Sequence, residues 1–166
     1  MDIMLRKWTL DDAQALAALF DALERTYLSN RIPSPYTAAD AAAWLETITA
    51  REGKSSVARS IWVDGSLVGN ISVKQKEDVY GKDAEIGYFL RRESYAKGIM
   101  TEAVRQVCAL AFSTLDLLRI TALVYSPNTA SRRVLEKNGF LLEGVMKNAV
   151  VKGDMVYDLC IYGKLR

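Results

Sequence analysis

The stretch that decides the fold is Ser126-Pro-Asn-Thr-Ala-Ser-Arg-Arg-Val-Leu-Glu-Lys-Asn-Gly-Phe140. Asn128 stands where a helix N-cap belongs, and Ser131 and Leu135 follow at helical spacing. Asn138-Gly139 ends the helical pattern before an apolar run. The stretch therefore predicts a short helix over about 128–137, with polar side chains gathered at its N-terminal end.

The residues on either side of this helix predict one more helix and four strands. Strands are predicted over 83–91 and 118–125, and a helix over 96–113, where apolar residues fall on one stripe. Two closing strands follow over about 140–146 and 155–163. This order places a strand, a helix, a strand and a helix in succession before a final hairpin.

The first half of the chain predicts a strand over 3–8 and an Ala/Leu-rich helix over 11–28, with a break in the middle of that helix left open. Two prolines exclude a helix over 30–36. Thr37 and Asp40 then resemble a capping box for a helix that runs to about Arg51. The pair Asp64-Gly65 predicts a hairpin between strands 56–63 and 66–75. Together the segments predict an α/β sandwich around one mixed sheet, in one domain over 1–166.

Composition excludes several classes of function. The 166 residues carry 22 basic and 20 acidic side chains and no histidine. Without a basic stripe we expect no nucleic-acid partner, and without histidine no His-dependent triad or HExxH zinc site. We expect no metal site. Cys108 and Cys160 lie in apolar segments and are predicted to be core thiols of a reducing compartment.

We expect no targeting or membrane segment in these residues. No apolar run follows the charges of the first eight residues, as a signal peptide would require. The uncharged stretch 106–115 is about half as long as a membrane-spanning helix. We expect a cytoplasmic protein with no membrane partner.

A second informative stretch is Tyr95-Ala-Lys-Gly98-Ile-Met-Thr101, at the start of the helix predicted over 96–113. A helix N-terminus presents free N–H groups and the positive end of the helix dipole, which together bind phosphate. Gly98 permits close approach to the backbone, and Lys97 adds positive charge. The stretch matches neither the P-loop nor the dinucleotide pattern. Plain turn chemistry is the alternative interpretation of a single glycine here.

These stretches resemble the GCN5-related N-acetyltransferases (GNATs), and within them the RimJ/RimL-type ribosomal-protein N-acetyltransferases. The resemblance is carried by Glu85-Ile-Gly-Tyr88, by Lys97-Gly-Ile-Met-Thr-Glu-Ala103, by 128–144 and by the closing 152–162. It covers essentially the full domain. The chain departs from the general loop pattern with Tyr95 at the first position and Met100 at the last, where a side chain is expected to narrow the room near the phosphates.

The resemblance implies a mixed, mostly antiparallel sheet with a splayed central strand pair, helices on both faces and acetyl-CoA as the cofactor. An N–H near Phe89 or Leu90 is then expected to bind the thioester oxygen. The cofactor-binding residues that the resemblance implies are Phe89, Leu90, Arg91, Tyr95, Ala96, Lys97, Gly98, Ile99, Met100, Thr101, Asn128, Ser131 and Arg132.

Acetyl transfer to an amine requires a base for the amine proton and a donor for the departing thiolate. Glu85 is the candidate base, although the same carboxylate could orient the amine or simply be a charged residue on a sheet face. The resemblance makes Ser131 the thiolate partner, with a first-turn serine as the alternative. Tyr125 is the rival acid. Arg132 is expected to meet the adenosine phosphates or to lie on a solvated helical face.

The acceptor is the least constrained part of the prediction. The segments 11–28, 30–36 and 147–154 are expected to shape its pocket, with Arg31, Tyr36 and Glu85 as substrate-binding candidates. Arg31 and Tyr36 could equally be packing and surface residues. A primary amine is expected, and a protein N-terminal α-amine is favoured over a polyamine, an amino acid or an aminoglycoside. A non-catalytic acyl-CoA sensor and an enzyme for another acyl group are the alternatives. Homodimerisation is left open.

Overall fold

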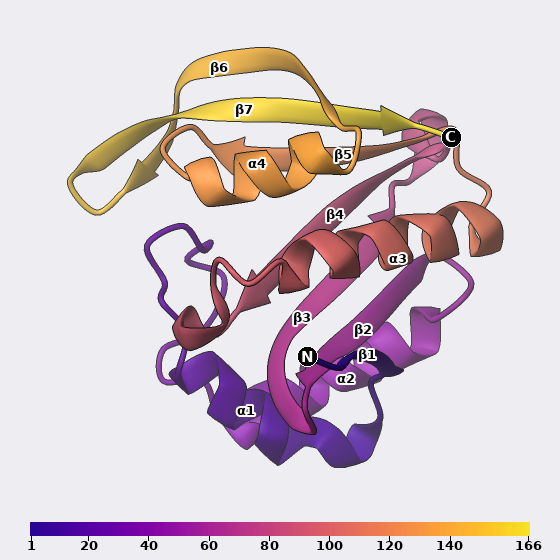
Figure 1. Cartoon of the computed structure of the whole chain (residues 1–166), viewed down its shortest axis with the longest axis vertical. Coiled ribbons are helices and arrows are strands. Elements are labelled where there is room, and N and C mark those ends of the chain that lie inside the picture. The colour runs from indigo at the N-terminus through magenta and orange to yellow at the C-terminus, as the bar shows by residue number, and fades with distance from the viewer.

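The computed structural model describes all 166 residues, which form one seven-stranded sheet with helices on its faces (Figure 1). The sheet order is β1-β2-β3-β4-β5-β7-β6, and only β4 and β5 run parallel. The strands are β1 (Ile3–Lys7), β2 (Ser56–Val63), β3 (Ser66–Gln75), β4 (Asp83–Leu90), β5 (Arg119–Tyr125), β6 (Leu141–Lys152) and β7 (Met155–Leu165). The helices are α1 (Ala13–Asp21), α2 (Ala38–Arg51), α3 (Ile99–Thr114) and α4 (Thr129–Lys137).

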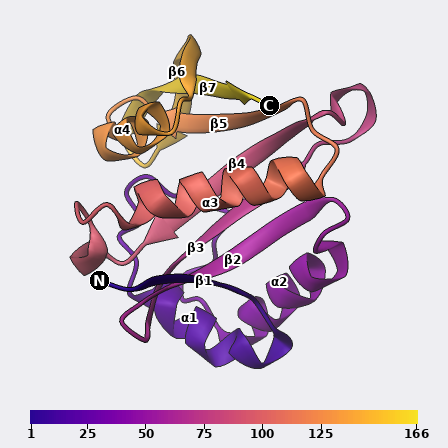
Figure 2. The same ribbon diagram turned by 45° about the vertical axis from the view of Figure 1, so that its right-hand side comes forward.

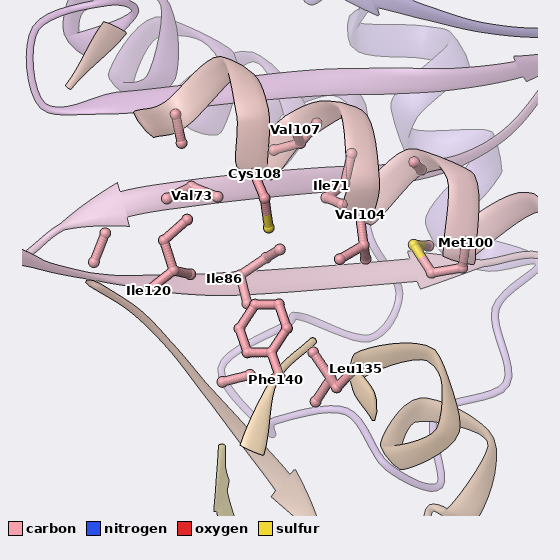
Figure 3. Close-up of a cluster of buried hydrophobic side chains, with 14 of the residues drawn as sticks. Ile71, Val73, Ile86, Met100, Val104, Val107, Cys108, Ile120, Leu135 and Phe140 are labelled. Carbon is pink, nitrogen blue, oxygen red and sulfur yellow. The ribbon is translucent and has the colours of Figure 1, made fainter. Parts of the chain in front are cut away.

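The N-terminal part of the sheet is covered on both faces. Figure 2 shows α1 and α2 on one side of β1–β3 and α3 on the other. The two faces carry separate cores: the larger packs α3 and α4 against the sheet, as Figure 3 shows for Ile86, Val104 and Leu135. The smaller packs Leu16, Phe20 and other residues of α1 and α2 against the opposite face.

The central strands β4 and β5 separate soon after they begin. They pair only over Asp83–Glu85 and Arg119–Thr121, although β4 continues to Leu90 and β5 to Tyr125. In Figure 1 the two strands diverge toward the N-terminal ends of α3 and α4. The expected splayed strand pair is therefore confirmed, and two helix starts flank the open end of the gap.

Local signals placed most element boundaries correctly. Asp64 and Gly65 both have positive φ, 48° and 80°, as a type I′ hairpin turn requires. The Thr37 side chain accepts from Asp40 N–H, and the Asp40 carboxylate accepts from Thr37 N–H at 2.8 Å. The hairpin and the capping box are both confirmed.

The helix predicted over 11–28 is wrong in its second half. A 3₁₀ turn at Leu10–Asp12 leads into α1, which ends at Asp21. The loop that follows makes tertiary contacts instead of helical bonds: the Lys152 ammonium donates to the carbonyl oxygens of Arg25 and Leu28. The second half of the segment is thus held against the end of β6.

Two further boundaries differ from prediction. The helix α3 begins at Ile99 rather than 96, because Ala96 and Gly98 both adopt positive φ, 58° and 78°. The strand β6 continues to Lys152, beyond the predicted 146, and pairs with β7 up to the hairpin tip. Cys108 and Cys160 are buried free thiols. No helix combines the length and the apolar character that a membrane crossing demands.

Candidate functional site

The start of α3 presents hydrogen-bond donors that the chain itself does not use. The first helical bond runs from Glu102 N–H to Gly98 O at 3.1 Å, and no side chain caps the helix. The N–H groups of Gly98, Ile99, Met100 and Thr101 have no acceptor in the chain. A Cβ placed on Gly98 would meet no atom within 4 Å, so the space beside Gly98 is open. This end of α3 has the properties of an anion-binding site.

The segment that leads to this helix start contains a further unused donor, on Arg91. Its Nε is buried and has no hydrogen-bond partner in the chain, which is rare for a buried polar atom. Arg91 directly follows β4 and starts the loop that carries Tyr95 and Lys97. The free N–H groups at the start of α3 suit the phosphate groups of a coenzyme A molecule.

Met100 does not restrict the loop as its sequence position suggested. Only 7% of the residue is exposed, and its side chain packs in the larger core between α3 and the sheet (Figure 3). The expectation that Met100 narrows the room near the phosphates is wrong. Its side chain lies on the inner face of the helix, whereas its free N–H points out of the N-terminal end of α3.

The edge of β4 that faces the gap can be assigned from two hydrogen bonds to β3. Arg91 N–H donates to Val68 O at 2.8 Å, and Lys76 N–H donates to Asp83 O at 2.9 Å. Odd-numbered residues of β4 thus use their backbone groups toward β3. The backbone groups of Ile86, Tyr88 and Leu90 consequently point toward the separated β5 strand.

This parity distinguishes the two residues expected to supply an N–H near the thioester. The N–H of Leu90 points into the gap, and that of Phe89 points toward β3. The Phe89 side chain packs on Phe20 with a ring-centroid distance of 4.6 Å, in the smaller core. Leu90 therefore has the suitable amide, and Phe89 has a packing role on the other face.

Ser131 is held in the first turn of α4 by two contacts. Its N–H donates to Oδ1 of the N-cap Asn128 at 3.3 Å. Its Oγ lies 2.8 Å from the hydroxyl oxygen of Tyr88, which reaches it from β4. Burial raises the pKa of Tyr88 to about 12, against a smaller opposing effect of the Ser131 bond. Sequence reasoning placed Tyr88 only within the strand predicted over 83–91 and missed this contact.

Glu85 lies at the closed end of the gap. It is the last residue of β4 paired with β5, opposite Thr121, and its exposed side chain makes no hydrogen bond or ion pair in the chain. Because alternate residues of a strand point to opposite faces, Glu85 and Phe89 share one face and Tyr88 has the other. The carboxylate is thus free, on the face opposite the Tyr88–Ser131 pair.

Tyr125, the rival acid, is separated from Ser131 by the sheet. Val124 faces the larger core, so the next residue points to the opposite face of β5. There the Tyr125 ring stacks on Tyr157 at 6.0 Å and contacts the edge of Tyr27 at 6.5 Å. This aromatic cluster joins β5 and β7 to the loop after α1.

Other candidate residues have structural partners. Arg132 donates from Nε to Tyr162 Oη at 3.0 Å and from Nη1 to Ser126 O at 3.2 Å, which ties α4 to β7. Tyr36 is only 7% exposed and stacks on Phe20 at 4.2 Å. Arg31 is exposed and its guanidinium has no partner.

A cavity of about 330 Å³ lies elsewhere, between α3 and the C-terminal end of α4. Its lining includes Arg105, Cys108 and Lys164, whereas the free N–H groups of α3 and the Ser131 side chain lie at the N-terminal ends of the two helices. The Lys164 ammonium donates to Asn138 O at 2.5 Å, a contact that satisfies a carbonyl at the helix end.

Comparison with known proteins agrees with this geometry. The chain is 40% identical to YdaF of Bacillus subtilis over 103 residues, which are 62% of this chain and 56% of YdaF. It is 47% identical to YjcK of the same organism over 91 residues, 54% of this chain and 50% of YjcK. The chain thus spans about half the length of these two relatives. The ribosomal-protein-serine acetyltransferase of Escherichia coli is 30% identical over 105 residues, 63% of this chain and 58% of that protein.

A solved structure has the same fold over nearly the whole chain. It is described as RimL, a ribosomal L7/L12 alpha-N-protein acetyltransferase in complex with coenzyme A, and it superposes with a TM-score of 0.86. The superposition covers 98% of this chain and 93% of that one at 22% identity, so it shows the fold alone. The sequence profile of the acetyltransferase (GNAT) domain matches residues 2–141. This match covers most of the sheet and all four helices, and the chain belongs to the GNAT acetyltransferase family.

Proposed function

We propose that the chain transfers the acetyl group of acetyl-CoA, the donor that GNAT acetyltransferases use, to a primary amine. The amine attacks the thioester directly while both substrates are bound. The observation that carries the proposal is the set of unused N–H groups at the start of α3, beside the gap between β4 and β5.

The cofactor would lie across the two helix starts. The N–H groups of residues 98–101 supply donors for the pyrophosphate, and Lys97 supplies charge. The backbone of Leu90 supplies the amide at the edge of the gap. In this proposal the side chain of Tyr95, which is 46% exposed, covers the loop from outside, while Ala96 sets its turn with positive φ.

Glu85 is the proposed general base. An amine attacks only as the free base, yet a typical amine carries a proton at pH 7. The Glu85 carboxylate has no partner in the chain and lies on the face that also carries the loop after α1. It is therefore available to take the amine proton, directly or through a water molecule.

Ser131 is the proposed hydrogen-bond donor to the departing thiolate. It belongs to the first turn of α4, at the open end of the gap, and its backbone N–H is already satisfied by Asn128. Tyr125 lies on the other face of the sheet with Tyr27 and Tyr157. We therefore assign Tyr125 to the acceptor side rather than to the leaving group.

A protein N-terminal α-amine is the favoured acceptor. The support comes from relatives and neighbours whose names describe acetylation of ribosomal proteins. The acceptor would enter between the loop after α1 and the β6–β7 hairpin, which Lys152 holds together. We place the protein in the cytoplasm, where a reducing environment keeps Cys108 and Cys160 as thiols.

The test is release of coenzyme A from acetyl-CoA across an acceptor panel of peptides with different free N-termini, spermidine, single amino acids and an aminoglycoside. Turnover confined to the peptides supports the proposed acceptor, and turnover with a small amine alone replaces it. Succinyl-CoA in place of acetyl-CoA tests the acyl group. Tight binding of acetyl-CoA with no turnover on any acceptor would favour a non-catalytic sensor.

A further inference from the structure

The contact between Tyr88 and Ser131 joins the two strands of the fold's open gap through α4. Tyr88 belongs to β4 and Ser131 to the first turn of α4, which follows β5. Their hydroxyl oxygens lie 2.8 Å apart. No other side chain forms a hydrogen bond with Ser131 Oγ, so the orientation of its hydrogen depends on Tyr88.

The direction of this hydrogen bond follows from the alternatives open to Tyr88. If Ser131 donated to Tyr88, the phenolic hydrogen would have to bond to Ser131 O, which is 3.4 Å from the phenolic oxygen. That distance is beyond the usual range for an O–H donor, and an unsatisfied donor in a buried setting is costly. Donation from Tyr88 to Ser131 Oγ uses the hydrogen at 2.8 Å and leaves the Ser131 hydrogen free.

We propose that Tyr88 is a positioning residue: by donating to Ser131 Oγ, it directs the Ser131 hydrogen toward the sulfur of the leaving coenzyme A. This inference rests on the proposed acyl transfer. The hydrogen bond from Tyr88 also makes Ser131 a stronger donor, because an O–H group that accepts one hydrogen bond is polarised and donates a stronger one.

The protons and electrons of the step are accounted for without an additional reactant. The amine nitrogen bonds to the acetyl carbon, the C–S bond breaks, and its electron pair stays on the sulfur. The amine proton goes to Glu85. Ser131 donates a hydrogen bond to the thiolate but keeps its proton, as does Tyr88, and the thiolate takes a proton from water after it leaves.

The titratable groups around the pair do not interfere with a test between pH 7 and pH 9. Cys108 of α3 and Tyr162 of β7 are the ionisable neighbours of Tyr88. Burial raises the pKa of Cys108 to about 11 and that of Tyr88 to about 12, and burial also raises the pKa of Tyr162 above its ordinary value. A change in the affinity for coenzyme A relative to its desulfo analogue over this interval therefore reports ionisation of the ligand's own thiol.

The experiment measures binding of coenzyme A and of desulfo-coenzyme A by calorimetry at pH 7 and pH 9, which needs no acceptor. The measured quantity is the ratio of the affinity for coenzyme A to the affinity for desulfo-coenzyme A. Because Ser131 stabilises the thiolate, this ratio should be about tenfold higher at pH 9 than at pH 7, a gain that reports the hydrogen bond to sulfur. Tyr88→Phe keeps the ring and should reduce this gain to about threefold, while Ser131→Ala should abolish it.

The double variant of Tyr88→Phe and Ser131→Ala gives the decisive comparison. If Tyr88 acts through Ser131, the double variant behaves like Ser131→Ala alone. A Tyr88→Phe protein with the full gain would overturn the proposal, as would a wild-type protein that binds coenzyme A with no gain at pH 9. A wild-type protein that binds neither ligand would instead refute the proposed function. Tyr80→Phe, which removes a hydroxyl from an exposed ring away from the site, is the control.

Discussion

The starts of α3 and α4 lie on either side of the same gap, but they differ in whether their backbone N–H groups are hydrogen-bonded to a capping side chain. Gly98 precedes α3 with no capping side chain, and four successive N–H groups stay free. Asn128 caps α4 and takes the N–H of Ser131. The difference teaches that a helix start serves a ligand either by leaving donors unused or by using them to hold a side chain.

The largest expected effect concerns Glu85, which lies at neither helix start. Its substitution sharpens the comparison because it should change the rate of acetyl transfer without changing cofactor binding. Glu85→Gln should lower turnover by ~10²–10⁴-fold with acetyl-CoA affinity nearly intact, because the variant removes the base without touching the donors. Steady-state turnover and calorimetry measure the two quantities. A loss of turnover smaller than about threefold would leave Glu85 with an orienting or surface role.

The free-donor start is tested by Gly98→Asn. Asparagine tolerates the left-handed conformation of this position, so the fold should survive, but its side chain enters the open space beside this position, next to the free N–H groups. Acetyl-CoA affinity should fall by about 100-fold, as for several lost charge-assisted bonds. Calorimetry gives the affinity.

Gly65→Asn is the matched control. Gly65 also has a positive φ, 80°, and a side chain placed there would meet no atom within 4 Å, but the residue lies in the β2–β3 turn. Equal affinities for the two variants and the wild-type protein would break the comparison by showing that the start of α3 does not bind the cofactor.

The capped start is tested through the side chain it holds. Ser131→Ala should lower turnover about tenfold and weaken acetyl-CoA binding less, because the hydrogen bond to sulfur strengthens as the thiolate forms. Rates and affinities are compared with those of Tyr125→Phe. Full activity in Ser131→Ala, with a loss in Tyr125→Phe, would transfer the role to the tyrosine on the other face.

The smallest expected effect concerns the cap itself. Asn128→Ala should lower the free energy of unfolding by about 1 kcal/mol, the usual cost of losing an N-cap. It should also lower turnover, because Ser131 loses a contact that holds it. Denaturant unfolding and steady-state kinetics measure the two effects.

Thr37→Ala removes the corresponding cap of α2, far from the gap. It should cost a similar stability and leave turnover unchanged. If both variants lost stability and neither lost activity, the cap of α4 would be purely structural.

Short-range signals in the chain predicted much of the fold. The β2–β3 hairpin, the cap of α2 and the cap of α4 were predicted from two to four neighbouring residues each, because turn geometry and capping depend only on local backbone and side-chain chemistry. The resemblance to GNAT acetyltransferases predicted the splayed strands and is confirmed by the family match.

The errors share a different physical origin. The helix predicted over 11–28 fails beyond Asp21 because Lys152, more than a hundred residues later, takes two of the loop's carbonyl groups. Tyr36, for which substrate binding and packing were both open, is buried against Phe20. In these segments the long-range contacts determined the conformation and overrode the local helical propensity and the expectation from residue type.

The sequence by itself determined where most elements begin and end, which face of each is apolar, and that Gly98 and Asn128 stand at helix starts. Only the tertiary structure decided that Tyr88 meets Ser131 across 43 positions, that Tyr125 lies on the other face, and that Leu90 rather than Phe89 presents its amide to the gap. The reason is physical: these relations depend on strand register and on the packing of α4 against α3 and β5, which no short stretch of sequence encodes.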